Sequence, residues 1–172
     1  YLQQNSIFKR YLKFIKRCFI VHLLRQYSLE LDNISKKHKN ILWINISAPS
    51  FGDSLMDLSS RVLLQNKNVD LFTNITDSSI YSEDEIFSNV FTDKKLIIKK
   101  KYNLVIIDSY STRSLKVKFD IAPSTPYVGM YGFYNGPDIN RTLFSFHRLN
   151  HLLGYMSNEK RISSPARNES NI

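Results

Sequence analysis

The run Leu104–Ile107 (LVII) is the feature that most restricts the fold of this chain. Successive residues of a strand point to opposite faces of a sheet, so a strand without a polar residue is buried on both faces. Burial on both faces is typical of parallel sheets that have helices on either side. We therefore expect Leu104–Ile107 to be a central parallel strand of an α/β domain, with Asp108 closing it.

Strands and helices are expected to alternate from Asn40 to Gly154. By their apolar runs, the expected strands are Ile41–Ile46, Val69–Asn74, Val90–Phe91, Leu104–Ile107 and Tyr127–Tyr131. By periodicity and capping residues, the expected helices are Ser54–Gln65, a short helix opened by the capping box of Ser82 and Glu85 and running toward Phe87, Thr112–Phe119, and Arg141–Leu153. Alternation at this spacing predicts βαβ units, and hence a Rossmann-like three-layer α/β domain with a parallel sheet.

Length and composition set the expected domain organisation. A chain of 172 residues, 42% of them hydrophobic, can bury one core. We expect an N-terminal helix and connection over residues 1–39, the α/β domain over 40–156, and a polar linker or tail over 157–172 that leads toward a further domain. Cys18 is the only cysteine, which excludes an intrachain disulfide and fits a reducing, cytoplasmic compartment.

The first element, residues 7–29, is expected to be a basic amphipathic helix. At 100° per residue its apolar side chains share one broad face, which consists of Ile7, Tyr11, Phe14, Ile15, Cys18, Phe19 and Val21. Basic residues occupy the opposite arc, no acidic residue precedes Glu30, and the net charge of the whole chain is +9. Such a helix either lies in an anionic membrane surface or packs on the domain with its basic residues in water, and the sequence leaves both possibilities open.

The turn after the first strand gives the strongest indication of function. Gly52 and Asp53 stand between the strand Ile41–Ile46 and the helix that is expected to begin at Ser54. Open α/β sheets bind their ligands at the carboxyl ends of the strands, where this carboxylate is expected. An Asp at such a place is either a general base that faces a ligand or the N-cap of the helix, a role worth ~1 kcal/mol.

The order of several short motifs resembles that in the lipopolysaccharide heptosyltransferases, the family 9 glycosyltransferases. The succession of strand, loop, Gly52-Asp53 and apolar helix is similar to the start of that family. The later similar motifs are Tyr102–Asp108, Ser111–Ser114, Val128-Gly129, Phe146–Arg148 and Leu152–Gly154. The chain departs from the family at Ser59, where a proline is usual, and near Asn45, where an arginine is usual.

This resemblance implies the N-terminal half of a GT-B enzyme, in which two Rossmann-like halves face a cleft. The implied reaction is inverting transfer of a heptose or related sugar from a nucleotide-sugar of the ADP-heptose kind to a lipid-linked, lipopolysaccharide-type saccharide. Asp53 is the expected catalytic base. The expected acceptor-binding residues are Gly52, Ser54, Arg113, Arg141 and His147. No metal or other cofactor is implied.

The resemblance also predicts the partners and location of the protein. A C-terminal domain of the same protein would bind the donor, so the half described by this sequence would be inactive alone. The enzyme would work at the cytoplasmic face of the inner membrane, as a peripheral protein. The rival hypothesis is a non-catalytic α/β module that docks on anionic membrane or on a protein partner through residues 7–29.

Several other residues have structural alternatives to a functional role. Lys116 and Lys118 are expected on a solvated helix face. Trp43 and the turn Tyr131–Tyr134 could stack on sugar rings, but packing is the expected role. The neighbours of the Ser82 capping box, Glu83-Asp84, suit a helix dipole better than a metal site. The chain lacks dinucleotide and P-loop glycine motifs and any recognised nucleic-acid module, so no nucleic-acid partner is expected.

Overall fold

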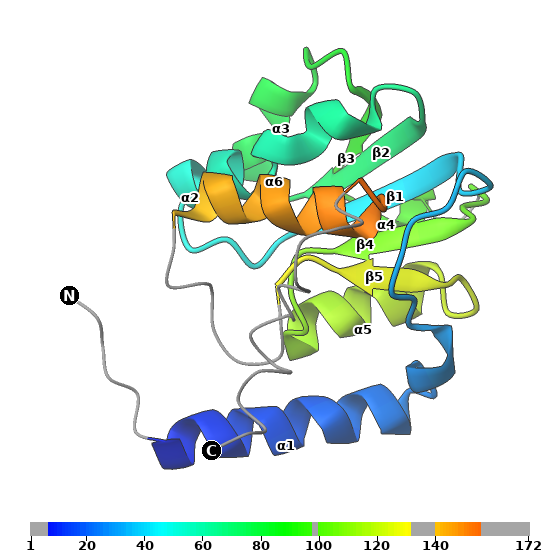
Figure 1. Cartoon of the computed structure of the whole chain (residues 1–172). Coiled ribbons are helices and arrows are strands. Elements are labelled where there is room, and N and C mark those ends of the chain that lie inside the picture. Colours follow the sequence, from blue (N-terminus) through cyan, green and yellow to red (C-terminus); the bar gives the residue numbers. More distant parts are fainter. Residues whose placement is uncertain (1–6, 98–99, 132–139, 156–172) are drawn as a thin grey trace.

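A computed structural model describes residues 7–97, 100–131 and 140–155, and its strands form one five-stranded sheet (Figure 1). The strands are β1 (Asn40–Asn45), β2 (Asn68–Thr73), β3 (Phe87–Phe91), β4 (Leu104–Ile107) and β5 (Tyr127–Gly129). Their order is β3-β2-β1-β4-β5, and every neighbouring pair is parallel. The predicted α/β class with a parallel sheet is confirmed, and the strand order is consistent with a Rossmann-like fold.

Four strands, β1, β2, β4 and β5, lie where the apolar runs predict them and are buried along nearly their whole length. The fifth, β3, begins at Phe87, before the expected Val90, and only Phe87 in it is fully buried. All four residues of β4 are buried, and β4 pairs with β1 on one side and with β5 on the other. In β1, Ile41 and Trp43 point into one core, and Leu42 and Ile44 point into the other. Trp43 is 1% exposed, so the core role expected for its ring is confirmed.

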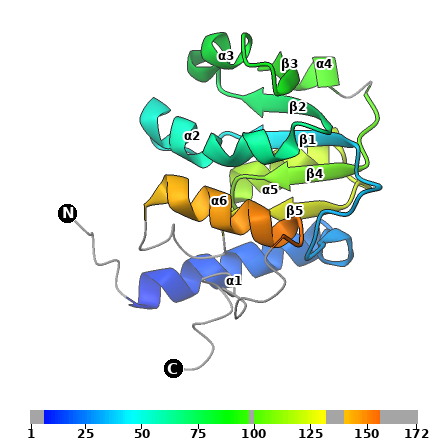
Figure 2. The same ribbon diagram turned by 45° about the horizontal axis from the view of Figure 1, so that its top comes forward.

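Helices cover both faces of the sheet and make three layers (Figure 2). One face packs against α2 (Phe51–Asp57), the 3-10 helix η2 (Ser59–Leu64), α3 (Ile75–Tyr81) and α6 (Arg141–Leu152). The other face packs against α4 (Lys94–Ile97), α5 (Thr112–Ile121) and the end of α1 (Ile7–Leu23), which is followed by the 3-10 helix η1 (Tyr27–Leu29). Among the described residues, no helix has the length and apolar character needed to cross a membrane.

Two helix predictions between β1 and β3 are wrong in detail. The helix expected over Ser54–Gln65 is α2 followed by η2, with Leu58 between them. The capping box of Ser82 and Glu85 opens no helix: Ser82 ends α3, and Phe87 already belongs to β3. Pairing with β2 holds the chain extended from Phe87 onward, and this long-range pairing outweighs a local capping signal.

The turn between α3 and β3 uses its acidic residues in another way. The Asp84 carboxylate accepts a hydrogen bond from Nε of Arg61 at 2.6 Å and another from the backbone N–H of Ile86 at 3.0 Å. Asp84 therefore fixes a turn and an ion pair, and it has no helix dipole to complement. The role expected for Glu83-Asp84 in a first helical turn is wrong.

Helix α1 ends at Leu23, before the predicted end near Leu29, because Arg25 adopts the left-handed conformation with a φ of 52°. The backbone N–H of Arg25 donates to the carbonyl of His22 at 2.9 Å, and that of Gln26 donates to the carbonyl of Val21 at 2.9 Å. These two bonds are those of a Schellman motif, in which the left-handed residue is usually glycine. The sequence offers no glycine there, so the helix end is not visible in it.

The apolar residues of α1 are divided between two sides, contrary to the prediction of one broad face. Val21 is 2% exposed and belongs to the core. Tyr11, Ile15 and Phe19 are 57%, 46% and 63% exposed. Only one side of the helix therefore packs on the domain.

Lys118 lies inside the protein, and its predicted place on a solvated helix face is wrong, whereas Lys116 is exposed as expected. The Lys118 ammonium donates to Oε1 of Gln26 and, at 3.3 Å, to the carbonyl of Pro123. It also lies 5.1 Å from the centre of the Tyr127 ring. These contacts tie the end of α5 to the chain that follows α1.

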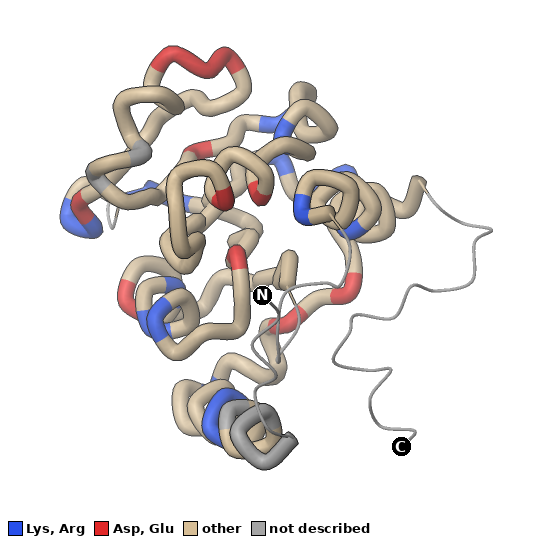
Figure 3. The backbone as a smooth tube through the Cα atoms, turned by 90° about the vertical axis from the view of Figure 1, so that its left-hand side faces the viewer, with Lys and Arg blue, Asp and Glu red and all other residues tan. Residues whose placement is uncertain are grey.

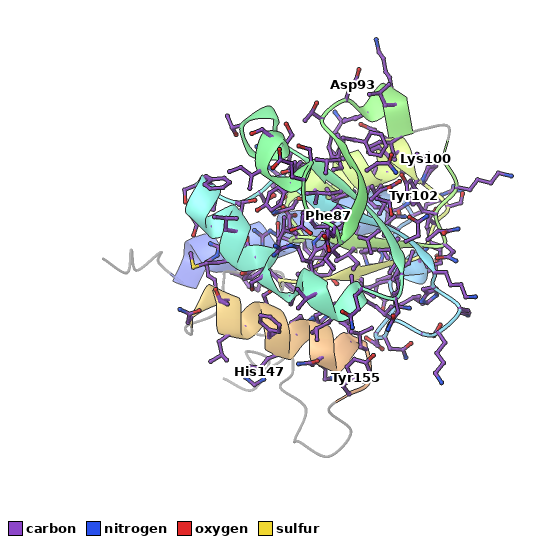
Figure 4. The ribbon with its side chains drawn as sticks, turned by 90° about the horizontal axis from the view of Figure 1, so that it is seen from above. Phe87, Asp93, Lys100, Tyr102, His147 and Tyr155 are labelled. Carbon is purple, nitrogen blue, oxygen red and sulfur yellow. The ribbon has the colours of Figure 1, made fainter. Side chains whose placement is uncertain are left out.

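A buried carboxylate, Asp70 of β2, holds the β3 side of the sheet together. It accepts hydrogen bonds from Asn89 at 2.7 Å, from Tyr102 at 2.7 Å and from Lys100 at 3.0 Å. Figure 4 shows Lys100 and Tyr102 on the side of the molecule away from His147. Burial, together with the hydrogen bond and charge of Asp70, raises the pKa of Tyr102, so its hydroxyl stays a donor.

Two predictions concern residues that the structure does not describe. These are the polar tail, 157–172, and Tyr134 of the aromatic turn.

Candidate functional site

The candidate site is the carboxyl edge of the sheet between β1 and β4. From β1 the chain proceeds outward to β2 and β3, then returns to β4 on the other side of β1. The connection after β1 leads to α2 on one face, and the connection after β4 leads to α5 on the opposite face. The loops therefore part at this point, where open α/β sheets bind their ligands. Figure 3 looks at the molecule from the side on which α2 begins.

Asp53 lies in the first turn of α2, and Ser50 caps that helix. The Ser50 hydroxyl accepts a hydrogen bond from the backbone N–H of Asp53 at 3.2 Å and donates one to Oδ2 of Asp53 at 2.7 Å. The alternative in which Asp53 itself is the N-cap is therefore wrong. Among the described residues, its carboxylate contacts the hydroxyl of Ser50 and the guanidinium of Arg141 and no backbone amide, and its side chain is 22% exposed.

Arg141, the first residue of α6, joins two carboxylates of α2. Its Nε and Nη2 donate to Asp57 at 2.9 and 2.5 Å, and its Nη1 lies 3.1 Å from Oδ1 of Asp53. Asp57 also accepts a hydrogen bond from the hydroxyl of Tyr131, whose ring lies 5.3 Å from the guanidinium carbon. The carboxyl end of the sheet therefore carries a connected group of Asp53, Asp57, Tyr131 and Arg141.

The electrostatics of this group keep Arg141 charged and Tyr131 protonated. Burial lowers the pKa of Arg141, but the hydrogen bond and charge of Asp57 outweigh burial and make the net shift upward. Burial is also the largest cause of the raised pKa of Tyr131, and Asp57 adds to it. A permanent cation beside Asp53 can orient that carboxylate or meet an anionic ligand.

On the β4 side, Asp108 is a buried carboxylate saturated with donors. It accepts hydrogen bonds from the backbone N–H groups of Ile46 (2.8 Å), Ser47 (2.5 Å) and Ser109 (2.6 Å), and from the hydroxyl of Ser114 (2.6 Å). Burial raises the pKa of Asp108, while these four bonds oppose the rise. Asp108 therefore joins the loop after β1 to the loop after β4 at the carboxyl edge of the sheet.

Three hydroxyls lie directly beside Asp108. Oγ of Ser47 is 2.9 Å from Oγ of Ser111 and 2.8 Å from Oγ of Ser114, and the last two are 2.9 Å apart. Ser111 also caps α5 by accepting from the backbone N–H of Ser114 at 3.1 Å. Ser47 and Ser111 are half-buried, so this cluster is partly accessible to solvent.

The predicted acceptor-binding residues occupy different environments. Gly52 and Arg113 are exposed in the first turns of α2 and α5, which lie on opposite faces of the sheet. Ser54 is completely buried, with its hydroxyl 2.9 Å from Nδ2 of Asn45. His147 lies half-buried on the side of α6 that faces away from the sheet (Figure 4). The structure brings Arg141 to Asp53, but it places Ser54 beneath the helix and His147 on the outer side.

Sequence reasoning missed the roles of Asp57, Ser47 and Ser114. Asp57 follows Asp53 by four residues, which places both on one side of a helix, and this spacing was the available signal. Ser114 follows Asp108 by six residues, but no local rule relates Ser47 to either. Among the described residues, no three His, Cys, Asp or Glu side chains are grouped so that they could hold a metal ion.

Comparison with known proteins gives no relative on which to base a function: no protein-family model, no curated protein and no solved structure matches this chain. The likeness to the heptosyltransferases therefore rests on the residues named above and stays a prediction.

Proposed function

We propose that this chain forms the acceptor-binding half of an inverting glycosyltransferase, with Asp53 as the base that accepts the proton of the attacking hydroxyl. The observation that carries the proposal is a partly exposed carboxylate in the first turn of α2, at the carboxyl edge where the strand order reverses. A carboxylate has about four acceptor positions. Ser50 and Arg141 use one each among the described residues, so Asp53 has capacity for a substrate hydroxyl.

Exposure also distinguishes Asp53 from the two other carboxylates of this edge. The side chain of Asp53 is 22% exposed, that of Asp57 is 6% exposed, and Asp108 as a residue is 3% exposed. Asp57 and Asp108 each have their oxygens bonded to several donors, so a sugar hydroxyl would have to displace them. Of these three carboxylates, Asp53 has the fewest contacts to give up to an incoming ligand, because its partners among the described residues are Ser50 and Arg141.

The proposed step transfers a sugar with inversion. The acceptor oxygen forms a bond to the anomeric carbon, while the bond from that carbon to the phosphate oxygen of the donor breaks. The bonding pair leaves with the nucleoside diphosphate, and the hydroxyl proton moves to Asp53. Because Arg141 pairs with Asp53, the acceptor must loosen this ion pair, and partly exposed pairs are worth only ~0–1 kcal/mol.

In this proposal the exposed residues at the start of α2 and of α5 bind the acceptor. Gly52 leaves room for a sugar beside α2, because an added Cβ would meet only Oγ of Ser50, at 3.9 Å. Arg113, in the first turn of α5, suits a phosphate or carboxylate of the acceptor, which its guanidinium can bind through two nitrogens. In this proposal Arg141 orients Asp53, Ser54 supports α2 from below, and His147 contacts only acceptor groups beyond α6.

The proposal includes the partners that the resemblance implies. The donor is a nucleotide-sugar of the ADP-heptose kind, bound by a C-terminal domain of the same protein in a GT-B arrangement. The acceptor is a lipid-linked saccharide at the cytoplasmic face of the inner membrane. The proposed step uses no metal or further cofactor, because basic residues and helix N-termini can neutralise the charge of a diphosphate.

The test is turnover of the intact protein, with its C-terminal domain, measured as ADP release from ADP-heptose in the presence of lipid-linked saccharide. Asp53→Asn is expected to lower turnover by ~100-fold or more with the thermal unfolding midpoint unchanged. The matched control is Asp120→Asn, which removes another exposed aspartate whose carboxylate pairs with a cation, Lys94, at 2.7 Å. Turnover of the Asp53 variant within about twofold of the control would exclude Asp53 as the base.

One observation favours the rival function, a non-catalytic module that docks through α1: the apolar residues of that helix remain exposed on one side. Docking and transfer are compatible in an enzyme with a lipid-linked acceptor. Vesicle binding by the intact protein, with no ADP release from the wild type under any acceptor condition, would favour the rival.

A further inference from the structure

The outward side of α1 carries a continuous apolar strip. Its residues, three or four positions apart along the helix, are Tyr11, Leu12, Ile15, Phe19 and Leu23. Between 46% and 66% of each residue is exposed, and Tyr27 of η1, 65% exposed, continues the strip beyond the helix end. Figures 1 and 2 place α1 at the outer face of the molecule, with α5 between it and the sheet.

The strip is separate from the side of α1 that packs on the domain. Val21 belongs to the core, and Phe14 and Cys18 on the same side of the helix are half-buried. The helix end is fixed by the hydrogen bonds of Gln26 to the carbonyls of Leu24 (2.9 Å) and Pro123 (3.1 Å). The domain therefore holds α1 with its apolar strip directed outward, and no rearrangement is needed to present it.

The charges on α1 indicate what kind of surface the apolar strip can bind. Residues 1–29 include six basic residues, Lys9, Arg10, Lys13, Lys16, Arg17 and Arg25, and no acidic residue. Figure 3 shows the coil of α1 with basic and without acidic positions. Two copies of such a helix would repel each other, because all their charges have the same sign. A surface that accepts apolar and aromatic side chains and carries negative charge is the interface of an anionic bilayer.

We infer that α1 lies in the interface of an anionic membrane, with Tyr11, Ile15, Phe19 and Leu23 among the acyl chains and Lys16 at the level of the lipid phosphates. This inference goes beyond the proposed transferase activity and does not depend on it. Apolar burial supplies the part of the affinity that salt does not screen, and the basic residues supply the part that it does.

The test is co-sedimentation of the intact protein with vesicles of phosphatidylcholine that contain or lack phosphatidylglycerol. The wild type should bind the anionic vesicles and bind the neutral ones at least ~10-fold more weakly, with the difference shrinking in high salt. Ile15→Asp should weaken binding to anionic vesicles by at least ~10-fold, because it removes one buried apolar side chain from the contact.

The matched control is Ile80→Asp on α3, where an isoleucine of similar exposure, 51%, changes to the same residue and alters the net charge equally. It should bind within about twofold of the wild type. Lys16→Glu on α1 and its control, Lys95→Glu on α4, form a second pair of variants. Only Lys16→Glu should bind anionic vesicles more weakly than the wild type. Far-UV circular dichroism of each variant tests that α1 remains helical.

Three results would overturn the inference. The first is equal binding by the Ile15 and Ile80 variants. The second is no preference of the wild type for anionic vesicles. The third is a wild-type dimer in analytical ultracentrifugation that Ile15→Asp converts to a monomer, which would assign the strip to a second copy. Failure of the transferase proposal is distinguishable, because Asp53→Asn should leave vesicle binding unchanged.

Discussion

Arg141 binds Asp57 through two nitrogens at 2.9 and 2.5 Å and extends its third nitrogen to Asp53 at 3.1 Å. The Asp57 end of this contact is buried and the Asp53 end is partly exposed. The same guanidinium can therefore stabilise the fold through one carboxylate and orient the proposed base through the other.

The two carboxylates should differ in their contribution to stability. Asp57→Asn should lower the free energy of unfolding by about 2–4 kcal/mol, because it leaves Arg141 and Tyr131 without their charged acceptor. Asp53→Asn should cost less than about 1 kcal/mol. Urea denaturation measures both, and equal costs would show that the buried end is not the structural one.

The two glycines near the sheet edge should respond in opposite ways to alanine. At Gly129 a Cβ would lie 2.3 Å from the ring of the buried Tyr110, so Gly129→Ala should cost about 3 kcal/mol or more. At Gly52 the nearest contact would be 3.9 Å away, so Gly52→Ala should leave stability unchanged or raise it by up to ~1 kcal/mol. In a Tyr110→Leu background the extra cost of Gly129→Ala should shrink; an undiminished cost would contradict the steric reason.

Replacement of Arg25 by glycine should stabilise the protein. The left-handed conformation of Arg25, with a φ of 52°, is unfavourable for a residue that has a Cβ. Arg25→Gly should therefore raise the free energy of unfolding by about 0.5–1 kcal/mol, which thermal denaturation detects. Arg25→Ala keeps the Cβ and should give no gain. A gain of the same size in the alanine variant would assign the effect to the lost charge.

Lys118 should make stability depend on pH in the alkaline range. Burial lowers the pKa of its ammonium group from 10.5 to about 8. Between these two values the unfolded chain binds more protons than the folded one, so the contribution of Lys118 to the free energy of unfolding rises with pH and is lost as pH falls through about 8.

Lys118→Met provides the comparison, since groups that titrate in both proteins cancel in the difference. The free energy of unfolding of the wild type minus that of the variant should increase between about pH 8 and pH 10. A difference that stays constant across this range would mean that the ammonium is not titrating inside the fold.

The parts of the fold that the sequence predicts are those set by local pattern. Leu104–Ile107 is buried on both faces as its composition requires, and Asp108 ends it. The helix predicted over Thr112–Phe119 extends to Ile121 in the structure, a difference of two residues. The capping box at Ser82 is also a local signal, but the helix that it predicts does not form. Pairing with β2 keeps the chain extended from Phe87 onward.

The sequence predicts only part of the candidate site, because the rest of the site depends on contacts between residues far apart in the chain. Asp53 could be singled out by its place after a strand, whereas its contact with Arg141 depends on how α6 packs against α2 from far along the chain. The Ser47–Ser114 hydrogen bond likewise joins residues 67 positions apart. Lys118 could not be predicted either. A charged residue on a helix is expected in water, and only its tertiary contact with Gln26 shows that it is buried.

The segment after α1 has a consequence for how the N-terminal region can be manipulated. Leu31 donates its backbone N–H to the carbonyl of Tyr127 at 2.8 Å, and Nε of Arg148 donates to the carbonyl of Gly129 at 3.0 Å. The two carbonyls of β5 that point away from β4 therefore both accept hydrogen bonds. An edge strand with occupied carbonyls is less able to pair with a strand of another chain. A deletion that reached Leu31 would expose the edge of β5 and promote aggregation. Single substitutions on α1 are therefore better tests of what this helix does than deletion of the N-terminal region.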